Sequence, residues 1–235
     1  MIIVNGDSFV QEAHLDLEQK WSTRIKADSN LALGAGSNDR IFYTTIDSLT
    51  EETCDVLIIG WTSWVRTFLS KSNGSRYRIC VGQAADERPN KTGGFDEDKT
   101  IADMYYKKIF NEFTQLKNTL MYMLHLQQYC ELKKIKLINF ATVFKKNDLH
   151  EDELQKIAKT ANMSRETKEI ENVGIQYNKN ILKKYISKLD PDTWINKTIF
   201  SSMSEILDDF PKTDICHIGA EGSKHWADII KRHLD

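Results

Sequence analysis

Three side chains of this sequence have the types and the order needed for nucleophilic catalysis. Ser8 follows the short apolar run 2–5, and Asp214 and His217 stand three positions apart near the other end of the chain. A serine hydroxyl becomes a nucleophile when an imidazole takes its proton, and an aspartate holds that imidazole in the right tautomer and stabilises its charged form. The sequence therefore predicts a serine-hydrolase triad of Ser8, His217 and Asp214.

Gly6-Asp7-Ser8 stands where the apolar run is expected to pass into a helix. Such a loop lies at the carboxyl edge of a parallel sheet, where open α/β sheets bind their ligands. The following helix would also direct backbone N–H groups and a positive dipole end toward a developing negative charge. The alternative interpretation is that Asp7 or Ser8 only caps the helix.

Gly36 is the candidate oxyanion donor, because it ends the expected second strand and has no side chain to separate its N–H from a substrate oxygen. It could equally belong to a tight turn. For Asn38 and Asp39, which follow, helix capping is the expected role.

Apolar periodicity along the chain alternates between strands and helices, as in an α/β fold. Strands are expected at 2–5, 31–33, 55–60 and 136–140, and helices at 9–20, 38–49, 100–130 and about 221–234. The run 55–60 is the most secure strand, because consecutive aliphatic residues suit burial on both faces of a parallel sheet. Polar stretches at about 70–99 and 150–190 are expected insertions in a single domain spanning 1–235.

Charge and composition bear on partners and location. The 32 basic and 34 acidic side chains leave a net charge of −2, which creates no strong field for nucleic acid or acidic lipid. No run approaches the ~20 apolar residues of a membrane span, and no basic hydrophobic leader is present. The four cysteines are widely spaced without a CxxC pair, which indicates buried thiols rather than disulfides or a zinc site. We expect a cytoplasmic protein with no nucleic-acid or membrane partner and no metal.

The candidate residues together resemble the SGNH (GDSL-like) hydrolase family. Its members carry the nucleophile in an N-terminal Gly-Asp-Ser, an oxyanion Gly after the second strand, and Asp-x-x-His near the end. Gly6-Asp7-Ser8, Gly36, and Asp214 with His217 match these blocks in order, and 222–227 is similar to the stretch after the family's histidine. The resemblance implies a three-layer, flavodoxin-like fold with a central parallel sheet of about five strands, order 2-1-3-4-5, and helices on both faces. It leaves both insertions unexplained.

One block departs from the family pattern. The third block, Gly-x-Asn-Asp, supplies an Asn amide to the oxyanion hole, whereas this chain has Gly60-Trp61-Thr62-Ser63. Loss of one such donor typically lowers turnover by about 10²–10³-fold. The Thr62 hydroxyl could replace the amide, or Thr62 and Ser63 could only cap a helix beginning at Trp64. A similar variant is found in hydrolase-like proteins of tailed phages and their hosts, which raises a viral origin.

The implied activity is ester hydrolysis without a cofactor. Ser8 would attack the acyl carbon, His217 and Asp214 would handle the proton, and the N–H groups of Ser8 and Gly36, with Thr62, would receive the oxyanion. The hypothesised substrate is a short acyl ester, such as an O-acetyl group on a carbohydrate.

Three tryptophans near the expected mouth, Trp61, Trp64 and Trp226, could stack on sugar rings or could pack in the core.

Two other classes of function remain open. A carbohydrate-binding or structural protein could keep this fold with little turnover, and the missing Asn favours that interpretation. A flavodoxin-like nucleotide binder would share the sheet, but the chain has neither a GxGxxG nor a GxxxxGK loop, so this function ranks last.

Overall fold

The computed structural model describes residues 1–34, 36–70, 76–79, 104–143, 150–161, 168–213 and 217–234. At its centre lies a four-stranded sheet in the order β2-β1-β3-β6, in which every neighbouring pair is parallel. The strands are β1 (Ile2–Asn5), β2 (Ser29–Asn30), β3 (Val56–Trp61) and β6 (Lys136–Ala141). The expected α/β class and the order of the first four strands are confirmed.

The central strand β3 is buried along almost its whole length, as its run of aliphatic residues predicts. Successive side chains of a strand point to opposite faces. Accordingly Leu57 and Ile59 belong to one hydrophobic cluster, while Ile58 between them belongs to the other. β3 therefore contributes side chains to both hydrophobic clusters.

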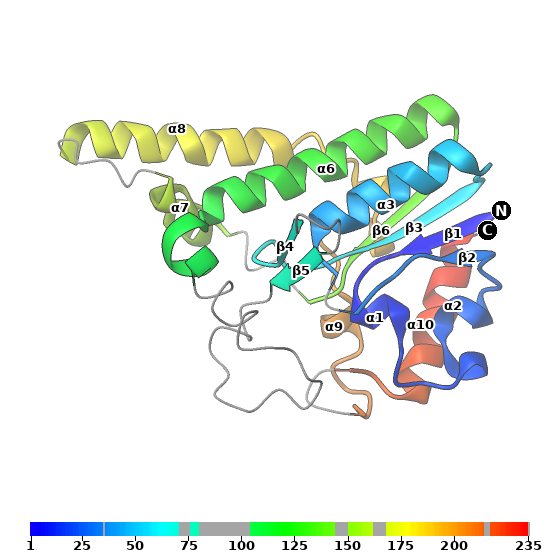
Figure 1. Ribbon diagram of the computed structural model, residues 1–235. Coiled ribbons are helices and arrows are strands. Elements are labelled where there is room, and N and C mark those ends of the chain that lie inside the picture. The colour runs from blue at the N-terminus through cyan, green and yellow to red at the C-terminus, as the bar shows by residue number, and fades with distance from the viewer. Residues whose placement is uncertain are drawn as a thin grey trace.

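Helices cover both faces of the sheet (Figure 1). The helices α3 (Asn38–Glu51) and α6 (Glu112–Lys133) pack on one face, and α1 (Ser8–Gln11), α2 (Trp21–Arg24) and α10 (Ala220–Leu234) pack on the other. This three-layer arrangement is the one that the resemblance implies.

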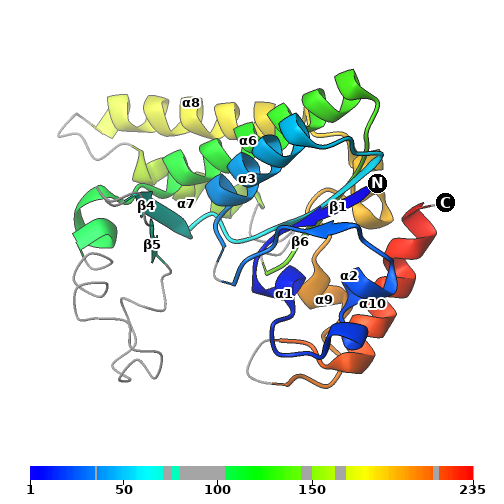
Figure 2. The ribbon, with the colours of Figure 1, turned by 45° about the vertical axis from the view of Figure 1, so that its right-hand side comes forward.

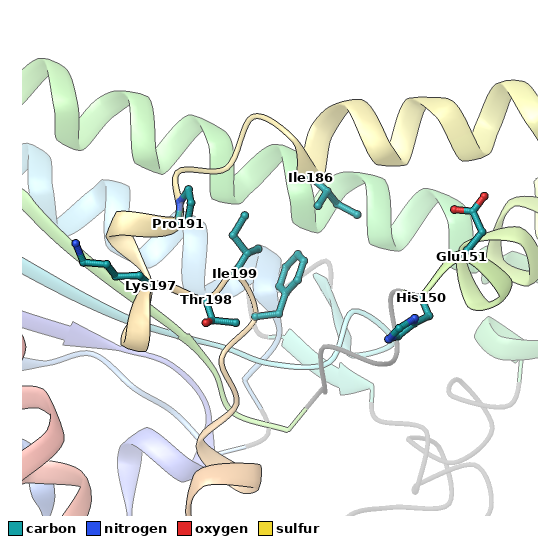
Figure 3. Close-up of a pocket in the computed structure, with 8 residues that line it drawn as sticks. His150, Glu151, Ile186, Pro191, Lys197, Thr198 and Ile199 are labelled. Carbon is teal, nitrogen blue, oxygen red and sulfur yellow. The ribbon is translucent and has the colours of Figure 1, made fainter.

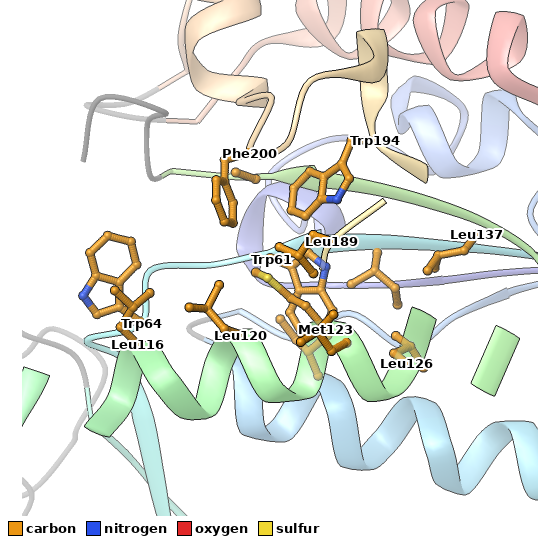
Figure 4. Packing of buried hydrophobic residues seen from close by; sticks show 14 of the residues in the cluster. Trp61, Trp64, Leu116, Leu120, Met123, Leu126, Leu137, Leu189, Trp194 and Phe200 are labelled. Carbon is orange, nitrogen blue, oxygen red and sulfur yellow. The ribbon is translucent and has the colours of Figure 1, made fainter. Parts of the chain in front are cut away.

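The core between β3 and α6 contains large side chains (Figure 4). Trp61 is fully buried beside Met123, and its Nε1–H donates to Asn139 Oδ1 at 2.9 Å. Trp64 is only 7% exposed and lies in the same cluster, while the fully buried Trp226 lies on the opposite face of the sheet. Of the two roles considered for the three tryptophans, the structure therefore shows packing in the core rather than stacking on sugar rings.

The remaining elements lie around the sheet edge and over α6. The hairpin of β4 (Thr67–Ser70) and β5 (Arg76–Ile79) lies beside the start of α3 (Figure 2). The helices α7 (Glu151–Thr160) and α8 (Lys168–Ile186) pack against α6 and against each other. The short elements are η1 (Leu17–Gln19), η2 (Tyr105–Ile109, π-helical), η4 (Pro191–Thr193), η5 (Ile195–Lys197) and α9 (Met203–Ile206). None of the helices in the described ranges is long and apolar enough to cross a membrane.

Several expected boundaries are wrong. The helix expected over 9–20 ends at Gln11, because Glu12 adopts a left-handed conformation (φ 47°), and the chain continues through η1 into α2. The second strand is Ser29–Asn30 rather than 31–33. The long helix is regular only from Glu112, after the π-helical turn η2.

The place expected for a fifth strand lies beside β6. Within the described ranges, Trp194 and Ser202 make only isolated parallel bridges there, to Asn139 and Ala141 respectively. The segment that follows α8 thus runs along β6 without forming a regular ladder.

Candidate active site

Ser8 lies at the carboxyl end of β1, as the first residue of α1 and half-buried. Asp7 is the helix cap, since its Oδ1 accepts the Phe9 N–H at 3.0 Å. With four residues, α1 is a single turn, so its dipole contributes less at Ser8 than a longer helix would. The capping role expected for Asp7 is confirmed, and it leaves the Ser8 hydroxyl for another role.

The Asp7 carboxylate connects three strands. It is fully buried, and its Oδ2 accepts hydrogen bonds from Thr62 Oγ1 at 2.7 Å, Arg66 Nη1 at 2.8 Å and Thr142 Oγ1 at 3.1 Å. Thr62 follows β3 and Thr142 follows β6, so these donors come from the carboxyl ends of neighbouring parallel strands. A buried carboxylate needs such partners, and they fix the residue before Ser8.

Gly36 lies against the Ser8 loop. A Cβ at this position would be 3.2 Å from the Gly6 carbonyl oxygen and 2.9 Å from that of Leu33, so only glycine fits without displacing backbone. Its N–H donates to Leu33 O at 2.9 Å and closes a turn. Gly36 therefore lies close to the loop that carries Ser8, as its expected role requires, but its N–H is engaged within the protein.

Thr62 is fully buried and no helix begins at Trp64, so the alternative in which Thr62 and Ser63 only cap a helix is wrong. The Thr62 hydroxyl donates to Asp7, and its N–H donates to Asn38 Oδ1 at 2.9 Å. The Asn38 Nδ2 in turn donates to Thr62 O at 2.8 Å. Asn38 is therefore a clamp between α3 and the end of β3, not the helix cap that we expected.

His217 packs on the residue next to the proposed nucleophile. Its ring centroid lies 5.0 Å from that of Phe9 and 5.1 Å from that of His14. Residues separated by about two hundred positions in the sequence are thus brought to the same place. A hydrogen bond between Ser8 Oγ and the imidazole is not among those formed by the described residues, and Asp214 lies outside them.

Sequence reasoning gave His14 no role. Its Nε2–H donates to Ile218 O at 2.9 Å and so ties the loop after α1 to the residue that follows His217. Thr213, which precedes His217 in the sequence, donates its N–H to His217 O at 2.9 Å. These two bonds hold the backbone that carries the imidazole.

His14→Ala is expected to lower kcat for an ester substrate by about 10- to 100-fold, because a small displacement of a general base is costly. His14→Gln keeps an N–H donor and should recover most of the loss. The matched control is His125→Ala, on the exposed surface of α6. Steady-state kinetics with circular dichroism would check this, and a wild-type kcat in His14→Ala would contradict the positioning role.

A cavity of about 490 Å³ lies apart from these residues, between the start of α7, the end of α8 and the segment 191–200. Figure 3 shows the residues that line it, His150 and Lys197 among them. Ser8 and His217 do not line this cavity, so we assign it no part in ester hydrolysis.

No family model and no curated protein matches the sequence. Among solved structures, an acetyl xylan esterase is similar over 100% of both chains, with 11% identity and a TM-score of 0.45. A member of the lipolytic protein G-D-S-L family from Veillonella parvula (10% identity, 98% and 96% coverage, TM-score 0.40) and the psychrotrophic esterase EstA from Pseudoalteromonas sp. (9%, 99% and 95%, 0.47) are also similar. Likenesses at these identities and scores do not assign an activity to this chain, so the function is argued from its residues.

Proposed function

We propose that this protein is a serine esterase that hydrolyses short acyl esters through Ser8, His217 and Asp214. The observation that carries the proposal is the contact between His217 and Phe9, which puts an imidazole beside the residue that follows Ser8. The buried, four-fold hydrogen-bonded Asp7 supports it by holding Ser8 at the carboxyl edge of the sheet.

The proposed reaction has two steps. Ser8 Oγ bonds to the acyl carbon while His217 takes the hydroxyl proton, and the imidazolium then returns that proton to the departing alcohol as the ester C–O bond breaks. In the second step His217 deprotonates water, which attacks the acyl-enzyme, and Ser8 leaves with its proton restored. Asp214 stabilises the imidazolium in both steps. The substrate class that we infer is an acetyl or similarly short ester, including O-acetylated carbohydrate.

A second candidate is a binding protein with little turnover. The observation that favours it is that the Gly36 N–H and the Thr62 hydroxyl both donate within the protein. Two of the three donors expected for an oxyanion are thereby engaged, and oxyanion stabilisation is often the largest catalytic term.

A fluorophosphonate probe distinguishes the two candidates, because it phosphonylates a serine only where a base activates it. We expect a mass increase on the peptide that contains Ser8 in the wild type and none in Ser8→Ala. Ser187→Ala, which removes an exposed serine of another surface, should be labelled like the wild type. A folded wild-type protein that stays unlabelled would support the binding protein instead.

A further inference from the structure

Arg66 is the one charged donor to the buried Asp7 carboxylate among the described residues. It follows the turn after β3, in which its N–H donates to Ser63 O at 3.2 Å. Its Nη1 lies 2.8 Å from Asp7 Oδ2, and its side chain is 22% exposed, whereas that of Asp7 is 0% exposed. The guanidinium therefore lies at the boundary between the buried carboxylate and the solvent.

The Arg66 guanidinium has more N–H donors than its contact with Asp7 uses. It carries five N–H groups in a rigid plane, and in the described part of the chain only the Nη1 contact with Asp7 engages them. Asp7 also receives the hydroxyls of Thr62 and Thr142 and the Phe9 N–H, so Arg66 is the fourth donor to a carboxylate that already has three. Neutralising Asp7 explains the charge of Arg66 but not its unused N–H groups.

The residue that Arg66 contacts suggests a use for these N–H groups. Asp7 immediately precedes Ser8, and the ion pair anchors the guanidinium to that residue. Gly36 and Thr62, the two donors expected beside the nucleophile, are engaged with Leu33 and Asp7. A partly desolvated, pre-positioned cation stabilises developing negative charge far more effectively than solvent does.

We propose that Arg66 is a catalytic residue that donates to the oxyanion in place of the amide missing after β3. The inference rests on the proposed esterase function. As Ser8 Oγ bonds to the acyl carbon, the carbonyl π electrons move onto oxygen, and an Arg66 N–H donates to that oxyanion. The electrons return to form the C=O bond when the leaving alcohol departs with the proton from His217. Asp7 keeps the guanidinium in place throughout this cycle.

The competing explanation is that Arg66 only neutralises Asp7. Arg66→Met alone cannot separate the two roles, because it also leaves a buried carboxylate without its cation. Asp7→Asn/Arg66→Met removes both charges, while the Asn side-chain oxygen can still accept the Phe9 N–H. The ratio of kcat between Asp7→Asn and this double variant therefore measures what the guanidinium contributes to turnover.

With p-nitrophenyl acetate, we expect the double variant to have a kcat about 100-fold below that of Asp7→Asn with a similar KM, while its Tm recovers from the value of Arg66→Met. The control Arg232→Met, at the exposed end of α10, should leave kcat and Tm unchanged. If the wild type is active, equal kcat values in Asp7→Asn and the double variant would overturn the proposed role of Arg66. A wild type that neither turns over the ester nor takes the fluorophosphonate would instead overturn the esterase function itself, and the role of Arg66 with it.

Discussion

Ser8→Ala is expected to lower turnover of p-nitrophenyl acetate by about 10⁴- to 10⁶-fold, and His217→Ala by a similar factor. The double variant should be no less active than either single one. A nucleophile and its base act as a unit, so removing one already removes the contribution of the other. If the two side chains acted independently, the fold losses of the two single variants would instead multiply in the double variant.

The structure makes these variants informative, because neither should unfold the protein. Ser8 is half-buried, and alanine there leaves the hydrogen bonds of Asp7 intact. His217 packs on Phe9, which has its own place in the core at 3% exposure. The kcat/KM of each variant, with circular dichroism as the check on folding, would test the pair. Losses that multiply, or a Ser8→Ala variant with wild-type activity, would refute the Ser8–His217 unit.

Three of the four strands of the central sheet, β1, β3 and β6, were predictable from the sequence because their signal is local. The short apolar runs of β3 and β6 suit burial on both faces of a parallel sheet, and this signal does not depend on distant residues. The first helix shows the opposite case, since apolar residues at helical spacing over 9–20 also fit a single α-helical turn and a 3₁₀ turn. What ends α1 is Glu12, whose carboxylate is buried and accepts the Trp21 N–H at 2.7 Å. That tertiary contact has no signature in the local pattern.

The polar network around Ser8 was predicted only in part, for the same physical reason. The Gly-Asp-Ser block predicts that Ser8 follows the end of a strand, and in the structure Ser8 does follow β1. The partners of Asp7, however, are Thr62, Arg66 and Thr142, and the last lies 135 positions away. Polar residues directly after strands that run in parallel meet at one edge of the sheet. That rule could have grouped Asp7 with Thr62 and Thr142 before the structure was known, although it could not have paired them with Arg66.

Glu12→Gln is expected to remove a pH dependence of stability that lies between pH 4.5 and about 7. Glu12 is fully buried, and its Oε1 has no hydrogen-bond partner among the described residues. Burial raises the pKa of Glu12 from 4.5 to about 7, and the nearby Ser223 hydroxyl and the Trp21 N–H offset part of this rise. The folded state therefore binds its proton more tightly than the unfolded state does.

The sign of the effect follows from that difference. Below pH 4.5 the Glu12 carboxyl is protonated in both the folded and the unfolded state, so its ionisation does not lower the free energy of unfolding. Between pH 4.5 and about 7, the free energy of unfolding of the wild type decreases as the pH rises. Above about pH 7 the loss is complete, and it amounts to about 3 kcal/mol, a large fraction of the 5–15 kcal/mol typical of a folded domain.

Glutamine cannot ionise, so Glu12→Gln removes this pH dependence. Its amide oxygen can still accept the Trp21 N–H, and any cost of its buried NH₂ group is the same at every pH. The free energy of unfolding of the variant relative to the wild type should therefore rise by about 3 kcal/mol from pH 4.5 to pH 8. Urea titrations at both pH values would measure it, with the exposed Glu18→Gln as the matched control. A difference between Glu12→Gln and the wild type that stays constant across this range would mean that Glu12 is ionised in the folded protein at pH 5, and that burial does not control its proton.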